Sequence, residues 1–295
     1  MENSFFSIII TSFNSANYIS KTINSITKQN YSNYEVILVD DCSTDGTLNF
    51  VEKNYKKKIK LFSTEQNFGG PAKSRNIGIQ NSTGEWISFL DADDFWFQNR
   101  LCYFDKFIKN NPLNDVFCSN EIKYNIDTRK KNKIFHGPFS ENFFNNLLIN
   151  GNKLSPSATM VRRDFIVENK ILFDEKPELI GVEDYDFWLN LAKNKANFYF
   201  IAKFLNIYQI HNENISNNGQ KHMENTINAI NKNFEFLQTK NKKKLYSYRI
   251  FMIRFSFLIN ELRKKKNLFK NLIKTILCIL SQPTFTVQFI IKKIK

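Results

Sequence analysis

The sequence predicts an α/β fold with a mostly parallel central sheet, followed by a basic helical region. Three short apolar runs, residues 7–10, 34–39 and 86–90, are each followed at once by polar residues, as expected of strands buried on both faces of a parallel sheet. Between the first two runs, residues 16–29 carry isoleucines at spacings of four and three, which is a helical stripe. The order strand, helix, strand predicts a right-handed crossover unit.

The same alternation continues to about residue 215. The further elements expected, in chain order, are a helix at 47–55, a strand at 59–62, a helix at 71–80, strands near 116–119 and 197–202, and a helix at 185–193. Beyond about residue 215 the pattern is helical and basic. The predicted organisation is one domain over residues 1–215 and a basic helical region over residues 216–295.

Composition limits the class of protein. With 295 residues, 42% of them apolar, the chain can bury one large core or one domain plus an appendage. The four cysteines are too scattered for a close-spaced metal pair or a disulfide framework, which favours a reducing cytoplasm. Glu2 stands where a signal peptide carries basic residues, and the uncharged stretch 275–291 contains too many polar residues for a bilayer span.

The net charge of +14 is concentrated at the C-terminus. From residue 241 onward, fourteen basic residues face a single acid, Glu261, which leaves a net charge of +13 there. Beyond Lys264, apolar residues recur at helical spacing beside Lys266, Lys270 and Lys274. Such a helix is expected to lie among the headgroups of an anionic membrane. The alternative is that its apolar face packs on the first domain or on a second copy of the chain in a homo-oligomer.

Acidic residues end the second predicted strand. Asp40 and Asp41 precede a turn rich in helix-capping residues. A carboxylate there can accept hydrogen bonds from a base or from ribose hydroxyls, as in other nucleotide-binding folds. Ser43 and Asp45 could instead cap the next helix. We favour nucleotide contact for Asp41 and capping for Asp45.

A glycine-marked loop leads into the predicted helix at 71–80. Gly69 and Gly70 permit unusual backbone angles and close approach, and Lys73 and Arg75 place cations beside the start of the helix. Together these residues could hold a diphosphate. Helix starts often have this composition, so the loop alone is weak support.

Three acids follow the strand at 86–90 directly. Asp91 and Asp93 flank Ala92, and a turn there would bring both carboxylates toward one cation. Unpaired carboxylates so close repel each other, whereas a hard divalent cation neutralises them and bridges to phosphate oxygens. The alternative is a solvated acidic turn that caps the following helix.

Two further candidates come later in the chain. Glu183 and Asp184 stand at the mouth of the helix at 185–193, where the helix dipole alone favours acids. A carboxylate there could also accept a proton from an acceptor hydroxyl. His211 follows a strand-like stretch, but a lone histidine is more often a packing or surface residue than a metal ligand.

Taken together and in this order, these motifs resemble the family 2 glycosyltransferases with the GT-A fold. The matching segments are 7–14, 39–47, 67–78, 90–94, 183–184 and 208–211. They span about the first 215 residues, and the combination is far more specific than any single motif. The resemblance is to the bacterial branch that builds surface polysaccharides and lipid-linked glycans. It implies a Rossmann-like, nucleotide-sugar-binding catalytic domain over residues 1–215.

The resemblance also implies roles for individual residues. Asp184 matches the catalytic base, and Asp93 matches the direct metal ligand, with Asp91 nearer the ribose and His211 as an additional metal or diphosphate contact. Asp91 is included among the metal ligands. The residues expected to bind the donor are Thr11, Phe13, Asn14, Asp40, Asp41, Gly70, Lys73, Arg75, Asp91, Ala92 and Asp93.

Three positions depart from the family pattern. Family members often carry glycine where Cys42 stands, alanine where Ser74 stands and arginine where Gln209 stands. The first two changes are tolerable. Gln209 removes a positive charge near the expected diphosphate, which puts the assignment of that segment in doubt.

The reaction implied by the resemblance is a single displacement that inverts the sugar carbon. A base deprotonates an acceptor hydroxyl, and a nucleoside diphosphate departs with help from Mn²⁺ or Mg²⁺. We expect a UDP-sugar donor of a hexose or N-acetylhexosamine, a lipid-linked glycan acceptor in bacterial surface glycan or glycoprotein glycan assembly, and a peripheral location on the cytoplasmic face of the membrane. The choice of sugar lies in residues 135–185, where no physical rule converts side chains into a sugar identity.

Two other functions compete with this interpretation. A nucleotidyltransferase would also need carboxylates, a metal and a basic loop, but it would not need Asp184 as a distant base. A basic nucleic-acid-binding protein is suggested by the sequence pI of about 9.5, yet that function leaves the acidic strand end at Asp91 unexplained. We therefore expect no nucleic-acid partner.

Overall fold

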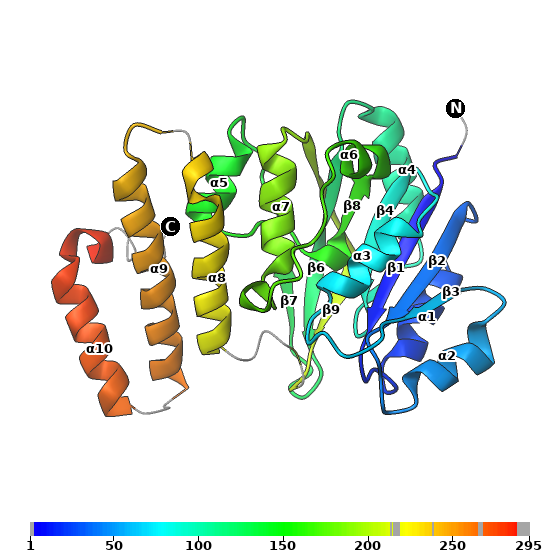
Figure 1. The fold of residues 1–295 in the computed structure, drawn as a ribbon, viewed down its shortest axis with the longest axis horizontal. Coiled ribbons are helices and arrows are strands. Elements are labelled where there is room, and N and C mark those ends of the chain that lie inside the picture. Colours follow the sequence, from blue (N-terminus) through cyan, green and yellow to red (C-terminus); the bar gives the residue numbers. More distant parts are fainter. Residues whose placement is uncertain (1–2, 213, 215–218, 238, 265–267, 288–295) are drawn as a thin grey trace.

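The structure is a computed structural model that describes residues 3–212, 214, 219–237, 239–264 and 268–287. A twisted sheet forms the centre of the molecule, and helices cover both of its faces (Figure 1). Three C-terminal helices stand beside one end of this body. The α/β fold predicted from the sequence is confirmed.

The first half of the chain alternates strands and helices. The elements are β1 Phe6–Ser12, α1 Ile19–Thr27, β2 Tyr34–Asp40, α2 Thr47–Tyr55, β3 Lys60–Ser63, α3 Ala72–Gln80 and β4 Trp86–Asp91. β1 pairs in parallel with β2 and β4, and β2 pairs in parallel with β3. Every residue of β1 is buried, as expected of a strand covered on both faces, and its centre is the apolar run Ile8, Ile9 and Ile10.

The rest of the chain adds strands of both directions to the sheet. The elements are β5 Phe95–Trp96, α4 Arg100–Asn110, β6 Val116–Asn125, β7 Lys131–Ile134, α5 Phe143–Asn150, the 3₁₀ turn η1 Pro156–Ala158, β8 Thr159–Arg162, α6 Arg163–Glu168, the 3₁₀ turn η2 Pro177–Leu179, α7 Glu183–Lys193 and β9 Phe198–Ile210. The strand order is β3-β2-β1-β4-β8-β6-β9-β5, with β7 paired to β6. β5, β7 and β8 run against the other strands, so the sheet is mostly parallel.

Alternate residues of β1 pack into two separate hydrophobic clusters, one on each face of the sheet. Ile9 packs with Phe89 into the cluster on the side of α7, whereas Ile8 and Ile10 pack into the cluster on the side of α1. A strand sends successive side chains to opposite faces, so one apolar run anchors both layers. The register of the paired strands determines which polar residues are neighbours at the sheet edge: Thr11 pairs with Asp91, and Ser12 pairs with Asp40.

In the described part of the C-terminal region the elements are α8 Gly219–Asn233, the 3₁₀ turn η4 Phe234–Phe236, α9 Lys242–Arg263 and α10 Leu268–Ser281. α8 packs on α7 and η2, α9 packs on α8 and α5, and α10 packs on α9. Lys232 joins α8 to the body, since its Nζ lies 2.7 Å from carboxylate oxygens of both Asp174 and Asp186. None of the helices in the described ranges is both long enough and apolar enough to cross a bilayer.

The outer helix α10 turns its polar stripe inward. Asn271 and Thr275 are buried against the neighbouring helix, while an apolar stripe faces outward. The exposed apolar residues of α10 are Leu272, Ile273, Ile276, Leu277, Ile279 and Leu280. These residues do not pack on the first domain, so that alternative is wrong for them. Lys266 and the side chains of Leu268, Phe269 and Lys270 lie outside the described residues.

Candidate active site

A cleft of about 930 Å³ opens at the carboxyl ends of β1 and β4 and extends to the helices α7, α8 and α9. Ligands of open α/β sheets bind at this edge, and the volume lies at the upper end of the ~300–1,000 Å³ typical of small-molecule sites. Most of the residues expected at the site line it. They are Thr11, Phe13, Asn14, Asp41, Gly70, Arg75, Asp91, Ala92, Asp93, Asp184 and His211.

Arg75 lies at the centre of the cleft wall and is only 2% exposed. Its Nη2 lies 2.9 Å from Asp91 Oδ1 and its Nη1 lies 2.7 Å from Glu183 Oε1. Burial opposes the charged form, but Asp91 and then Glu183 outweigh it and raise the pKa of Arg75. The pair of bonds ties the end of β4 to the start of α7. Loss of either carboxylate would leave part of a buried charge uncompensated.

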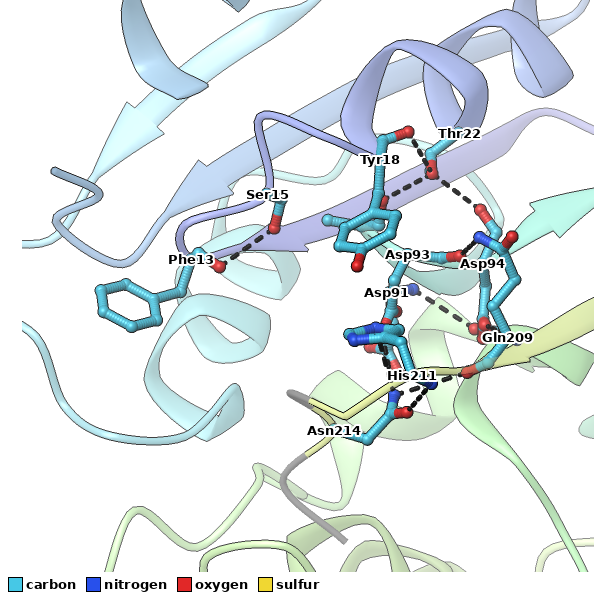
Figure 2. A network of polar contacts seen from close by, with 12 residues as sticks. Phe13, Ser15, Tyr18, Thr22, Asp91, Asp93, Asp94, Gln209, His211 and Asn214 are labelled. Atoms are coloured by element: carbon cyan, nitrogen blue, oxygen red, sulfur yellow. Dashed lines mark hydrogen bonds and ion pairs between the residues drawn. The ribbon is translucent and has the colours of Figure 1, made fainter. Parts of the chain in front are cut away.

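The Asp93 carboxylate is held by residues that follow β9. His211 Nε2 lies 2.8 Å from Asp93 Oδ2, and Asn214 Nδ2 donates to the same oxygen at 3.1 Å. The ring of Tyr18 stacks on His211 with a centroid separation of 4.6 Å. Figure 2 shows His211 and Asn214 gathered around Asp93. The sequence motifs at 90–94 and 208–211 therefore meet in space.

Gln209 fills the place where the family often has arginine. Its backbone N–H donates to Asp94 Oδ1 at 2.9 Å, and its side-chain amide hydrogen-bonds the Asp93 carbonyl oxygen (Figure 2). Burial, with help from the neighbouring Asp93 and Asp91 carboxylates, raises the pKa of Asp94 well above its usual range. Gln209 thus holds the acidic turn in place without adding charge.

The acidic turn has donor atoms that suit a hard divalent cation. Asp93 and His211 offer two ligand groups next to each other. Asp91, two residues before Asp93, is bonded to Arg75. No group of three His, Cys, Asp or Glu side chains in the described part of the chain forms a ready-made metal site. Mg²⁺ is commonly held by one or two carboxylates together with substrate phosphates and water, so the residues present fit such an ion.

Asp41 and Asp40 differ in their surroundings. Asp41 lines the cleft, and its carboxylate accepts hydrogen bonds from Thr64 Oγ1 at 3.0 Å and from Phe68 N–H at 3.1 Å. Burial raises the pKa of Asp41. Asp40 is fully buried, and it accepts hydrogen bonds from Ser12 Oγ and Ser43 N–H at 2.6 and 2.8 Å. Asp40 therefore shapes the turn and is not among the residues found to line the cleft.

Lys73 is also not among the residues that line the cleft. It borders a small hollow beside α3, where its Nζ is 3.4 Å from Glu175 Oε2. The glycine loop before it does reach the cleft, since Gly69, Gly70 and Pro71 line the wall. A side chain at Gly70 would meet Ile180, whose Cγ2 would lie 3.2 Å from the new Cβ.

Asp184 lies across the cleft at the N-terminus of α7. Asn152 Nδ2 donates to Asp184 Oδ2 at 3.1 Å, and Tyr185 N–H donates to Asp184 Oδ1 at 2.7 Å. Burial and the neighbouring Glu183 raise the pKa of Asp184 to about 7, against the opposing charge of Arg75. A carboxyl group with this pKa can accept a proton near neutral pH.

Several residues that line the cleft were missed from the sequence. They are Tyr18, Glu121, Asn152, Asn214, His222, Thr226 and Arg249. Apart from Tyr18, all come from beyond residue 120 and are brought to the cleft by packing between distant elements. No local motif marks them, although an alignment of relatives could.

Comparison with known proteins identifies the family. A family model described as glycosyl transferase family 2 matches residues 7–169, which is more than half of the chain. This chain belongs to glycosyl transferase family 2. The family resemblance found in the motifs is confirmed.

Two curated relatives illustrate the similarity. The poly(ribitol-phosphate) beta-N-acetylglucosaminyltransferase TarS of Staphylococcus aureus is 45% identical over 94 residues, which are 30% of this chain but only 16% of TarS. The UDP-Glc:alpha-D-GlcNAc-diphosphoundecaprenol beta-1,3-glucosyltransferase WfgD of Escherichia coli is 28% identical over 225 residues, which are 76% of this chain and 84% of WfgD.

The fold is shared with a solved relative. The crystal structure of residues 1–349 of S. aureus TarS in complex with UDP has a TM-score of 0.64 and 26% identity, covering 90% of this chain and 76% of that one. Because 90% of this chain is covered, part of the region beyond residue 215 lies within the match. The GT-A fold expected from the motifs is confirmed.

Proposed function

We propose that this chain is an inverting glycosyltransferase that transfers a hexose or N-acetylhexosamine from a UDP-sugar to a lipid-linked glycan acceptor. The observation that carries the proposal is the arrangement of acids in one cleft. Asp91 and Asp93 lie at the sheet edge, and Asp184 faces them from α7, with Arg75 and Glu183 between. A nucleotidyltransferase would have no use for the third acid.

The donor is inferred from family members of known substrate. TarS has been crystallised with UDP, and WfgD is named for UDP-glucose. In this chain, Thr11, Phe13 and Asp41 line the part of the cleft next to the sheet edge. Phe13 is 47% exposed, which leaves its ring available to stack on a base. Asp41 would accept hydrogen bonds from uracil or ribose.

Asp93 and His211 would hold a divalent cation together with the donor diphosphate. Such a cation, Mn²⁺ or Mg²⁺, would stabilise the charge that develops on the leaving diphosphate. Asp91, which already accepts a hydrogen bond from Arg75, would remain nearer the ribose. Asn214 and the stacked ring of Tyr18 would orient Asp93 and His211 in this role.

Asp184 would act as the general base. Its carboxylate would take the proton of an acceptor hydroxyl while that oxygen forms a bond to the anomeric carbon. The bond from the anomeric carbon to the diphosphate oxygen would break at the same time, and UDP would carry away the electron pair. Attack from the face opposite the leaving group inverts the sugar. Asn152 and Tyr185 N–H hold the Asp184 carboxylate in position for this step.

The acceptor would be presented at a membrane surface on its cytoplasmic side. WfgD acts on a diphosphoundecaprenol-linked sugar according to its name. The α10 apolar face, Ile273, Ile276, Leu277 and Leu280, is exposed and belongs to the segment that carries a net charge of +13. Apolar residues that insert between lipids, combined with cations that attract anionic headgroups, are the features of an interfacial helix.

The proposal is tested by measuring which nucleotide the protein binds. UDP with Mn²⁺ should raise the melting temperature more than GDP or UTP with Mn²⁺, and one member of a UDP-sugar panel should be hydrolysed faster than the others. Preferential stabilisation by UTP would favour the nucleotidyltransferase. Tight, salt-sensitive DNA binding without a UDP effect would favour a nucleic-acid-binding protein.

A further inference from the structure

Arg249 brings a positive charge from the C-terminal helices into the cleft. It lies on α9, yet it lines the same cleft as Asn152 and Asp184. α9 reaches this position by packing on α5 and α8. The cleft is therefore incomplete without a helix that follows the predicted boundary at residue 215.

The surroundings of Arg249 offer few protein partners. Its guanidinium group lies close against Gly151, where an added Cβ would come within 2.7 Å of Nη2, and it lies near the Tyr185 side chain, where its charge opposes the burial that raises the pKa of Tyr185. Its Nε is buried and has no hydrogen-bond partner. Among the residues that the structure describes, no carboxylate forms an ion pair with Arg249.

This environment is costly for an arginine. The guanidinium group stays charged at all physiological pH values and carries five N–H donors, and the partly buried Arg249 has no carboxylate beside it, among the described residues, to compensate this charge. The nearby acids are already engaged. Asp184 is held by Asn152 and Tyr185 N–H, and Glu183 is bonded to Arg75. An anion that enters the cleft would supply the missing partner.

We propose that Arg249 binds a phosphate group of the acceptor substrate. This inference rests on the proposed function and adds to it the chemical class of the acceptor, which carries a phosphate or diphosphate near the hydroxyl that Asp184 deprotonates. A planar guanidinium group binds a phosphate through two parallel hydrogen bonds, which a neutral sugar hydroxyl cannot match. The donor diphosphate is assigned to the other side of the cleft, beside Asp93 and His211, so Arg249 remains for a second phosphate.

The alternative is that Arg249 has only a structural role and holds α9 against α7 through Tyr185. The two roles differ in what they predict for ligands. A fastening residue would affect stability and all acceptors alike, whereas a phosphate-binding residue would affect only ligands that carry phosphate. Arg254 provides the matched control, because it is an exposed arginine of the same helix that is absent from the cleft lining.

The first test is binding of inorganic pyrophosphate to the full chain, measured by calorimetry with excess UDP and with a chelator present. The wild type and the Arg254→Gln variant should bind pyrophosphate equally well. Arg249→Gln should bind it about tenfold to a hundredfold more weakly, the range expected for one lost charge-assisted contact. Equal binding by wild type and Arg249→Gln, or no binding by either, would overturn the proposal.

The second test compares acceptors in the complete reaction. We would use N-acetylglucosamine linked through a diphosphate to a short alkyl chain and, for comparison, the neutral alkyl glycoside of the same sugar. Arg249→Gln should raise KM for the diphosphate acceptor at least about tenfold more than KM for the neutral glycoside, with Arg249→Lys intermediate. Equal losses with both acceptors would show that Arg249 only fastens the helix.

A third comparison identifies the source of the phosphate. If the alkyl diphosphate binds more tightly than inorganic pyrophosphate and both depend on Arg249, the acceptor is lipid-like; equal affinities would indicate recognition of phosphate alone. Manganese-dependent UDP binding is measured on every variant. Its absence in the wild type would defeat the proposed function itself, whereas its presence with no phosphate binding would defeat only the role of Arg249.

Discussion

The two sides of the cleft are built in different ways. On the proposed donor side, Asp41, Asp91 and Asp93 follow β2 and β4, and the register of neighbouring parallel strands brings them together. On the proposed acceptor side, Asn152 comes from a loop after α5, Asp184 from α7 and Arg249 from α9. The donor side depends on one sheet edge, whereas the acceptor side depends on how several helices pack.

This difference indicates how the cleft can vary among relatives. Neighbouring strands of one sheet can hardly move relative to each other without breaking backbone hydrogen bonds, so the donor side has a fixed geometry. Helices and loops tolerate larger changes, so the acceptor side can change its ligand. Arg75 connects the two sides through Asp91 and Glu183, which would keep the reacting groups aligned while the rest of the acceptor side changes.

The largest effect is expected from Asp184→Asn, which tests the acceptor side. The amide keeps the size and the hydrogen bond to Asn152 but cannot take a proton. Loss of a general base typically costs about a hundredfold to ten-thousandfold in rate, while UDP affinity should stay within about twofold. The control is Asp164→Asn, which changes an exposed acid in the first turn of α6. Near-normal turnover of Asp184→Asn would remove its role as the base.

Asp93→Ala tests the donor side and should abolish the part of UDP binding that depends on manganese. The variant loses the carboxylate that would hold the cation beside His211. Calorimetry with and without Mn²⁺ measures the effect, and Asp127→Ala, at an exposed position, is the control. Asp184→Asn should lose turnover and Asp93→Ala should lose donor affinity. If both variants lost the same property, the division of the cleft into two sides would be wrong.

Local sequence patterns predicted well the strands and the helix next to Asp41 and Asp91. The helix predicted at residues 47–55 is α2 Thr47–Tyr55, and the strands before Asp41 and Asp91 were found within one or two residues of their ends. Both features arise from short-range periodicity. Contacts such as that between Asp93 and His211 followed from the family pattern, and residue spacing alone would not have given them.

The second half of the chain was predicted less completely for a physical reason. β9 runs Phe198–Ile210, well beyond the predicted 197–202, because it continues along β6 past an irregularity in register near Asn120. Such pairing depends on a partner about eighty residues away. The same holds for Asn152 and Arg249, which reach the cleft only after α5, α7 and α9 have packed.

A smaller, pH-dependent effect is expected from Asn152→Leu. Because burial raises the pKa of Asp184 to about 7, kcat should fall as the pH drops through this value and the base becomes protonated. Asn152 donates to the carboxylate and so favours its charged form. Its loss should move the fall in kcat to higher pH. Profiles from about pH 5.5 to about pH 9 test this, with the exposed Asn150→Leu as control. An unshifted profile would separate Asn152 from the base.

The smallest effect on the cleft is expected from substitutions on the α10 apolar face, which lies outside both sides of the cleft. Leu277 and Leu280 are 60% and 70% exposed, so replacing both with glutamate should not disturb packing. The change should prevent insertion between lipids and repel anionic headgroups, since a charged side chain loses the ~1.5–3 kcal/mol that burial of a leucine provides.

Flotation with anionic vesicles measures this effect on the full chain. The wild type should float at low salt and less at high salt, and the double glutamate variant should remain at the bottom with unchanged UDP binding. A control with glutamate at Ser247 and Asn260, two exposed positions of α9, adds the same charge away from the α10 apolar face and should still float. Failure of the wild type to float would rule out the membrane. A concentration-dependent dimer lost only in the Leu277 and Leu280 variant would then identify a second copy of the chain as the partner of that face.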